Sequence, residues 1–166
     1  MKALIASLIV LLPALAFAGD DSDHCFLKNA AEGGLVEVEL GALAQEQGSS
    51  QAVKDFGAMM VRDHMVTNRK LQTLAASKDL ELPTDTTLMH KVWKKALSMK
   101  TGSEFDEDYI EGQIDAHEDT IELLKKEIET GEDADAKAFA SEILPKVEEH
   151  LALINQIAAQ EGIQDE

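Results

Sequence analysis

Four long segments of this chain place apolar or small residues three or four positions apart, a spacing that favours helices burying one face. They span roughly residues 23–47, 50–78, 103–131 and 133–162. Ser49 or Ser50 is placed to cap the second helix, and Ser103 opens a capping-box-like start of the third. Gly48 and Gly131 are stops for the first and third. The spacing therefore predicts four amphipathic helices.

The lengths of the connections predict how these helices are joined. Tight turns link the first helix to the second and the third to the fourth, so each pair forms an antiparallel hairpin. The connection 79–102 is long and carries a short helical stretch at about 86–99. About 14 helical and about ten extended residues span roughly 21 Å and 33 Å, whereas a 28-residue helix is about 42 Å long. We therefore predict an all-α, ferritin-like four-helix bundle, two antiparallel hairpins joined by a long crossover containing a short helix.

The composition agrees with this class. Aromatic residues make up only 4% of the 166 residues, which argues against a β-sandwich or barrel. Acidic residues outnumber basic ones 32 to 15, so the chain lacks the basic footprint of a nucleic-acid-binding protein. Cys25 is the only cysteine, which excludes a disulfide framework; we interpret it as a tolerated thiol, with an intermolecular disulfide or a loose metal contact as alternatives. The crossover holds the one basic patch, formed by Lys91, Lys94, Lys95 and Lys100. We expect it to be a solvated helix face, with a clamp on the acidic helices or a docking site for an envelope partner as alternatives.

Residues 1–18 are predicted to be a secretory signal peptide. Lys2 gives a positive start, an apolar run follows, and residues 16–18 form an A-x-A cleavage site ahead of an acidic stretch. The apolar run is short for a bilayer span, so we expect no integral membrane span after cleavage. The predicted mature domain is 19–166, periplasmic or secreted. Cleavage removes one base and no acid, which changes the formal charge from −17 to −18.

Each predicted helix carries one metal-competent side chain on its apolar face. These side chains are Glu37, His64, His117 and His150. Each stands three, four or seven residues from apolar or small neighbours on its own helix, which is the spacing of one helical face. Each also lies within about two residues, or roughly 3–4 Å, of the centre of its helix. We therefore expect one glutamate and three histidines to converge near the midplane of the core.

These ligand types predict a single-metal site. A buried charged carboxylate is costly unless it is paired or bound to metal, and three neutral imidazoles with one carboxylate complete a tetrahedral site. The alternative is a polar core cluster without metal, in which Glu37 hydrogen-bonds a protonated histidine. Zinc or copper is the expected metal, with iron and nickel also suited to these ligands, and no organic cofactor is expected.

Two neighbours of His64 have two interpretations each. Met60 shares its helical face, either as core filling or as a thioether ligand for Cu(I). Asp63 either fixes a ring tautomer from outside the site or is a solvated or interhelical acid.

No histidine of this chain has a glutamate three residues before it, so the Glu-x-x-His pair of ferritin-like di-iron sites is absent from the sequence. Nucleophile-elbow and phosphate-loop motifs are absent as well. Di-iron oxidase or ferroxidase chemistry is therefore not expected, and other metal-dependent catalysis would need an open coordination position. The two leading functions are metal binding, for handling or stress protection, and a non-metal envelope interaction or stress protein with structural histidines.

A set of short stretches spans about residues 26–159. They are Phe26 to Gly41, Val53 to Gly57, Met60 to His64, Leu82-Pro83, Phe105-Asp106 with Tyr109, His117, Leu144-Pro145 and His150-Leu151. Together they resemble the exported family of domain of unknown function DUF4142. The resemblance implies a ferritin-like fold and export, for a family with no firmly assigned activity.

Overall fold

The computed structural model describes residues 20–163; residues 1–19, which include the predicted signal peptide, and 164–166 lie outside that part of the chain. The elements in chain order are α1 (Asp20–Gln47), α2 (Gln51–Ser77), α3 (Leu88–Leu97), α4 (Ser103–Thr130) and α5 (Ala134–Glu161). Residues 20–163 contain no strand, which confirms the all-α class. Each predicted helix is present within a few residues of its expected bounds.

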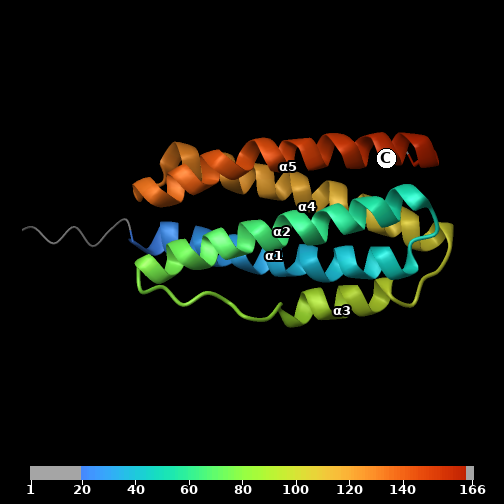
Figure 1. The fold of residues 1–166 in the computed structure, drawn as a ribbon, viewed down its shortest axis with the longest axis horizontal. Coiled ribbons are helices and arrows are strands. Elements are labelled where there is room, and N and C mark those ends of the chain that lie inside the picture. The colour runs from blue at the N-terminus through green and yellow to red at the C-terminus, as the bar shows by residue number, and fades with distance from the viewer. Residues whose placement is uncertain (1–19, 164–166) are drawn as a thin grey trace, which may run out of the picture.

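The four long helices lie alongside one another; α1 runs antiparallel to α2 and α4 antiparallel to α5, whereas α2 and α4 run in the same direction (Figure 1). α1 packs on α2 and α4 packs on α5. The segment between α2 and α4 runs back along the molecule, so that α4 starts at the end where α1 finishes (Figure 1). α3 forms the second half of this crossover. The length of connection 79–102 therefore serves to carry the chain from one end of the molecule to the other.

α3 lies over the seam between α1 and α4. Nζ of Lys94 donates to Oε2 of Glu39 on α1 at 2.8 Å. The ring of Trp93 lies so close to α4 that a Cβ added at Gly112 would come within 2.6 Å of it. Lys100 also forms an ion pair with Asp108 of α4. Lys94 and Lys100 thus clamp the acidic helices, which was an alternative to the solvated face expected from the sequence.

Local capping explains most of the helix boundaries. The side chain of Ser50 accepts a hydrogen bond from the Val53 N–H at the start of α2, and Asp133 caps α5 in the same way. α4 begins at Ser103 as expected, but its N-cap is Gly102, at φ 65°, without a side-chain cap. The predicted capping box is therefore absent there. The acids of the first turn of α4 lie beside the positive end of its helix dipole.

Each hairpin turn is held by a carboxylate of the other hairpin. Asp106 of α4 accepts hydrogen bonds from the backbone N–H groups of Ser49 and Ser50, at 2.8 and 2.7 Å. Asp23 of α1 accepts hydrogen bonds from the N–H groups of residues 132 and 133 in the α4–α5 turn, at 3.1 and 3.0 Å. Both carboxylates are buried. This reciprocal capping satisfies turn donors and ties the two hairpins together.

Candidate metal centre

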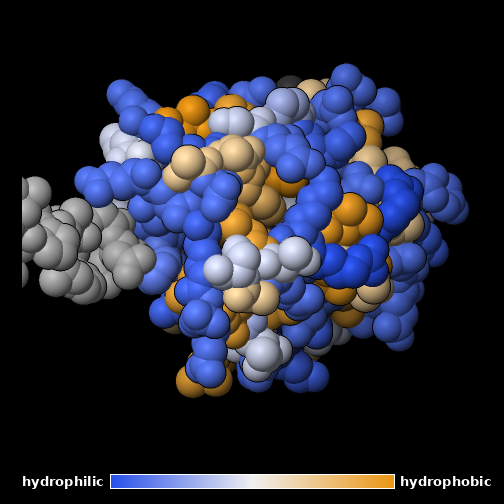
Figure 2. Space-filling model, turned by 60° about the vertical axis from the view of Figure 1, so that its left-hand side comes forward, coloured by the Kyte–Doolittle hydropathy of each residue, from blue (hydrophilic) through white to orange (hydrophobic). Residues whose placement is uncertain are grey.

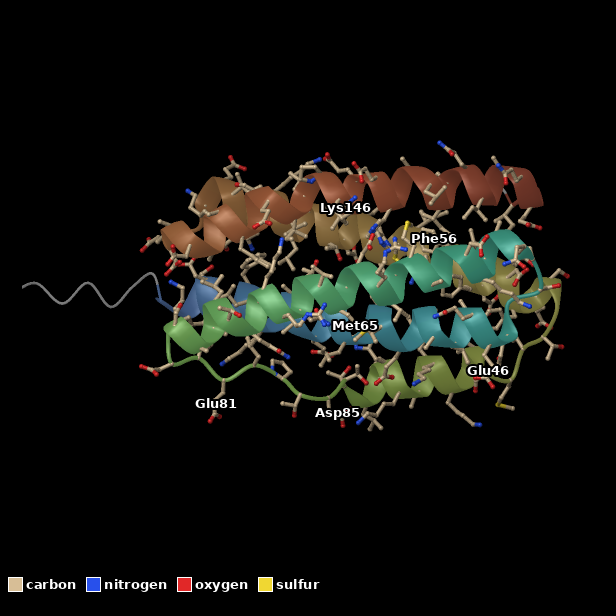
Figure 3. The ribbon with its side chains drawn as sticks, in the orientation of Figure 1. Glu46, Phe56, Met65, Glu81, Asp85 and Lys146 are labelled. Carbon is tan, nitrogen blue, oxygen red and sulfur yellow. The ribbon has the colours of Figure 1, made fainter. Side chains whose placement is uncertain are left out.

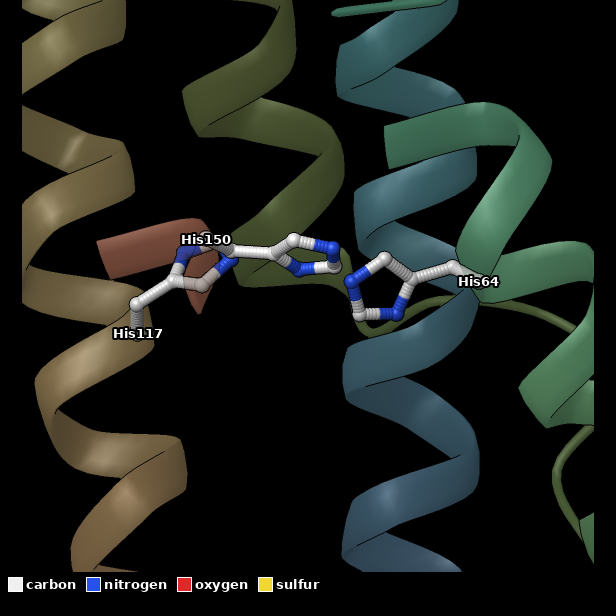
Figure 4. A group of neighbouring side chains, drawn as sticks. All are labelled: His64, His117 and His150. Atoms are coloured by element: carbon white, nitrogen blue, oxygen red, sulfur yellow. The ribbon is translucent and has the colours of Figure 1, made fainter. Parts of the chain in front are cut away.

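Three histidines from three helices meet inside the molecule (Figure 4). His64 belongs to α2, His117 to α4 and His150 to α5, and one ring nitrogen of each lies within 4.8 Å of those of the other two. The ring centroids are 5.6 to 6.4 Å apart. A point between three such atoms is no more than about 2.8 Å from any of them, and a zinc–nitrogen bond is about 2.0–2.1 Å. Ring movements of less than an ångström would therefore suffice to bind an ion.

Two of the rings are oriented by hydrogen bonds on their outer sides. Nδ1 of His117 donates to the carbonyl oxygen of Gln113 at 2.7 Å. Nε2 of His150 donates to Oδ2 of Asp63 at 3.2 Å. Because a neutral imidazole has only one N–H, the other nitrogen of each ring carries a lone pair. Metal-binding histidines are typically held in this way by a carbonyl or carboxylate.

The remaining nitrogens are buried without partners. Nε2 of His64, Nε2 of His117 and Nδ1 of His150 make no hydrogen bond. Buried polar atoms without a partner are rare and costly, so each of them calls for an explanation. An ion held between the three rings would satisfy all of them at once.

Burial keeps these imidazoles neutral. Desolvation lowers the pKa of His64 to about 3 and the pKa of His117 to about 4. Burial also lowers the pKa of His150, although the carboxylate of Asp63 opposes that shift. At neutral pH all three rings therefore offer lone pairs, which is the form that binds metal.

Glu37 shares this polar region but not the close group. Its side chain on α1 is 7% exposed, and its Oε2 has no hydrogen-bond partner. Desolvation raises the pKa of Glu37 to about 7, and the nearby amide of Gln113 partly opposes the shift. Within residues 20–163, the side chains with ligand atoms all within 4.8 Å of one another are the three histidines. The structure thus brings together three of the four predicted ligands and leaves the carboxylate to one side.

The polar residues divide the apolar core in two. One core cluster contains Leu40, Phe56, Met60, Phe105, Tyr109, Ile114 and Ile154. The other contains Phe26, Leu27, Leu71, Leu124, Phe139 and Val147. On every long helix the predicted ligand falls between residues of the first cluster and residues of the second. The expected placement at mid-height of the core is therefore what the packing shows.

A pocket of about 220 Å³ lies beside the centre. Glu37 and His64 both line it, together with apolar side chains of the second core cluster such as Phe139 and Val147. Gly33 of α1 also lines it, and a Cβ added there would meet nothing within 4 Å. The absence of a side chain at Gly33 keeps this side of the pocket open.

Other residues considered from sequence lie outside the histidine group. His90 of α3 contacts Oε1 of Glu32 through Nδ1 at 2.9 Å. Cys25 is exposed on α1. Met60 is fully buried in the first core cluster. Of the two α2 residues labelled in Figure 3, Phe56 is buried and Met65 is 46% exposed.

Sequence reasoning missed Gln113, Gly33 and the pocket. Gln113 is fully buried one helical turn before His117, and that i−4 spacing was a usable signal for the backbone bond. The sequence left the role of Asp63 open, because its partner His150 lies 87 residues away. Gly33 follows Ala30 by three residues, a spacing that predicts a place on the buried face of the helix, but it is exposed at the pocket.

The fold and the site together define an all-helical protein with a layer of three histidines across its core. The chain belongs to the family described as domain of unknown function DUF4142, whose sequence profile matches residues 13–157. This confirms the resemblance found in the sequence. No curated protein matches the chain.

Solved structures of other families share this fold. A DUF305 fragment from Deinococcus radiodurans has a TM-score of 0.75 at 9% identity, covering 86% of this chain and 98% of that one. A DUF305 protein from Streptomyces coelicolor, described as a candidate secreted protein, has a TM-score of 0.74 at 14% identity, covering 90% and 99%. A conserved hypothetical protein from Mycobacterium tuberculosis has a TM-score of 0.66 at 14% identity, covering 86% and 94%. Identities this low show likeness of fold alone.

Proposed function

We propose that this protein binds one divalent transition-metal ion, zinc or copper, at His64, His117 and His150. The observation that carries the proposal is the convergence of three buried imidazoles whose inward nitrogens have no hydrogen-bond partner. Glu37 lies in the same layer and would offset the charge of the ion without entering the histidine group. The protein would then serve in metal handling or in protection against metal stress.

The same proposal covers export and architecture. We infer that residues 1–18 are a cleaved signal peptide, and that the four long helices form a ferritin-like four-helix bundle in the periplasm or outside the cell. The DUF4142 family and the fold of a DUF305 protein described as a candidate for secretion support this inference. Among residues 20–163, no helix is long and apolar enough to cross a membrane.

Metal titration of the purified, untagged protein tests the proposal. We expect calorimetry with Zn²⁺ or Cu²⁺ to show one site, and His117→Ala or His150→Ala to weaken binding by about 100-fold or more, because each removes a ligand. His90→Ala is the matched control, since it removes a histidine outside the group and should leave affinity unchanged. Metal should also raise the unfolding temperature, and a chelator should reverse this gain. Absence of binding by the wild-type chain refutes the proposal.

A second candidate is a non-metal interaction protein of the cell envelope. The observation that favours it is the apolar surface of α3 and its C-terminal end, where Leu88, Met89, Val92 and Met99 are 58% to 78% exposed. In that case the histidines are structural. Replacing all three by leucine would then preserve or raise stability, and metal would not change the unfolding temperature of the wild type.

A further inference from the structure

We propose that the pocket beside the histidines binds a small, uncharged, largely apolar molecule whose lone-pair atom is the fourth ligand of the bound metal. This inference rests on the proposed function and states what the centre holds besides the ion. It assigns the pocket lined by Glu37 and His64 as a ligand site.

The centre is one ligand short of a complete set. Zinc is almost always bound by at least four donors, and centres with three protein ligands leave a position for an exogenous one. The close group among the described residues supplies three imidazoles and no carboxylate. His64 belongs both to this group and to the wall of the pocket. A molecule in the pocket would therefore lie beside one of the three proposed metal ligands.

The chemistry of the pocket wall selects the class of ligand. Most of its surface is apolar, from Ala30, Val36, Leu123, Leu124, Phe139, Ile143 and Val147. Its acids, Glu37 and Asp119, disfavour an anion, and the described lining residues include no lysine or arginine to attract one. His90 also lines the pocket, but its Nδ1 already contacts the carboxylate of Glu32. The volume of about 220 Å³ exceeds the roughly 150 Å³ apolar cavity that accommodates benzene. A six-membered ring with one donor atom therefore suits both its size and its polarity.

Three residues of the pocket wall, Glu37, His64 and Asn68, each carry a buried polar atom without a hydrogen-bond partner. Oε2 of Glu37 and Nε2 of His64 are buried without partners, and both residues line the pocket. Leu124, Phe139 and Val147 of the second core cluster supply apolar parts of the wall. A ligand with an apolar body would place that body on Phe139 and Val147 and its donor atom toward the centre. Gly33 is exposed at the pocket and would admit it.

Cobalt-loaded protein gives a direct test, because the visible absorption of Co²⁺ changes with its coordination. We would titrate Co²⁺-loaded full chain at pH 7.5 with pyridine as the uncharged probe and azide as the anionic one. We expect a saturable spectral change with pyridine, at a concentration at least tenfold lower than any change with azide. Gly33→Leu and, independently, Thr120→Leu fill the pocket from α1 and α4, and each should weaken pyridine binding at least tenfold without loss of Co²⁺. Lys28→Leu, which is exposed on α1 outside the pocket, should behave as wild type.

The outcomes separate this inference from the metal proposal. If Co²⁺ binds but pyridine changes nothing, or if neither pocket variant affects pyridine, the pocket assignment fails while metal binding stands. If azide binds as tightly as pyridine, the assignment of an uncharged ligand is wrong. If Co²⁺ itself does not bind to wild type, the proposed function fails as well.

Discussion

At the scale of the residue, the centre depends on what each imidazole does with its outer nitrogen. The carbonyl of Gln113 and the carboxylate of Asp63 accept from His117 and His150, which turns a lone pair of each ring inward. The bond to Gln113 is local to α4, whereas the bond to Asp63 joins α2 to α5. Asp63 therefore links the position of one ring to the helix that carries another, His64.

Removing the carboxylate of Asp63 should weaken metal binding without removing a ligand. Asp63→Ala leaves Nε2 of His150 without its acceptor, so the ring loses its fixed tautomer and some of its basicity. We expect a loss of metal affinity of about tenfold or more, measured by competition with a chromophoric chelator. Glu149→Gln, an exposed neighbour of His150, is the control and should bind as wild type. Wild-type affinity in Asp63→Ala would mean that this bond does not tune the site.

Glu37 should make the metal-free protein less stable as pH rises. Burial raises its pKa from 4.5 to about 7. Between these values the folded state holds a proton that the unfolded chain has lost, so the free energy of unfolding falls as pH rises through this interval. Glu37→Gln removes the effect. In urea unfolding, we expect the free energy of unfolding of the variant to be roughly 2–3 kcal/mol higher than that of wild type at pH 8 and equal to it near pH 4.

The histidines supply the opposite slope, which serves as an internal check. Burial lowers the pKa of His64 and of His117 below 6.5, so on acidification the unfolded chain binds protons that the folded state excludes. Their contribution is complete above pH 6.5 and is lost as pH falls toward 3–4. In wild type, protonation of Glu37 on acidification partly offsets this loss. The Glu37→Gln variant lacks that compensation, so its free energy of unfolding should fall more steeply than that of wild type as pH decreases from 6.5 to 4.5. A pH-independent difference between the two proteins would contradict this assignment.

At the scale of the element, glycines allow two neighbouring helices to approach each other closely. α1 and α2 come closest at Gly41 and Gly57, where a Cβ on either residue would lie 2.6 Å from the carbonyl oxygen of the other. Gly33, on the same helix as Gly41, faces open space instead. Glycines alike in sequence therefore have different reasons to be glycine.

This contrast predicts opposite effects of the same substitution. Gly57→Ala forces the two backbones apart and should lower the free energy of unfolding by about 1–3 kcal/mol. Gly33→Ala meets no atom and removes a flexible residue from a helix, so it should raise stability by about 0.5–1 kcal/mol. Denaturant unfolding of the two variants measures both effects. If both variants changed the free energy of unfolding in the same direction, helix propensity and not backbone contact would control these positions.

The elements themselves were largely predictable, because caps and apolar spacing are local. Ser50 and Asp133 cap helices where the sequence places a start. The start of α4 is the exception, since Ser103 was expected to cap it and Gly102 does so without a side chain. The acid three residues after Ser103 is Asp106, which serves the α1–α2 turn instead. A contact across 56 residues thus takes priority over a local one.

At the scale of the whole molecule, two hairpins are joined by reciprocal contacts at opposite ends. Asp106 holds the turn of the first hairpin, and Asp23 holds the turn of the second. The crossover with α3 adds ion pairs along the α1–α4 seam. The face of the molecule shown in Figure 2 is mainly hydrophilic with patches of hydrophobic side chains, in keeping with the acidic composition.

Loss of one of these carboxylates should weaken the whole assembly. Asp106→Ala leaves two partly buried N–H groups without their charged acceptor, and we expect it to lower the free energy of unfolding by about 2–4 kcal/mol. Glu107→Ala removes an exposed acid from the next position of α4 and should change stability by less than about 0.5 kcal/mol. Both values come from the same denaturant titration. A small effect of Asp106→Ala would show that the hairpins associate through their apolar faces alone.

The sequence by itself determined the helices, their order, and the layer in which Glu37 and the three histidines stand. Helical periodicity sets the face of each residue, and distance from the helix centre sets its height. Only the tertiary structure decided that the histidines approach one another while Glu37 stays apart, that Asp63 orients His150, and that a pocket opens at Gly33. These depend on how far each helix is shifted and turned against its neighbours. Such shifts of a few ångströms leave the periodicity unchanged, but they decide which atoms can share an ion.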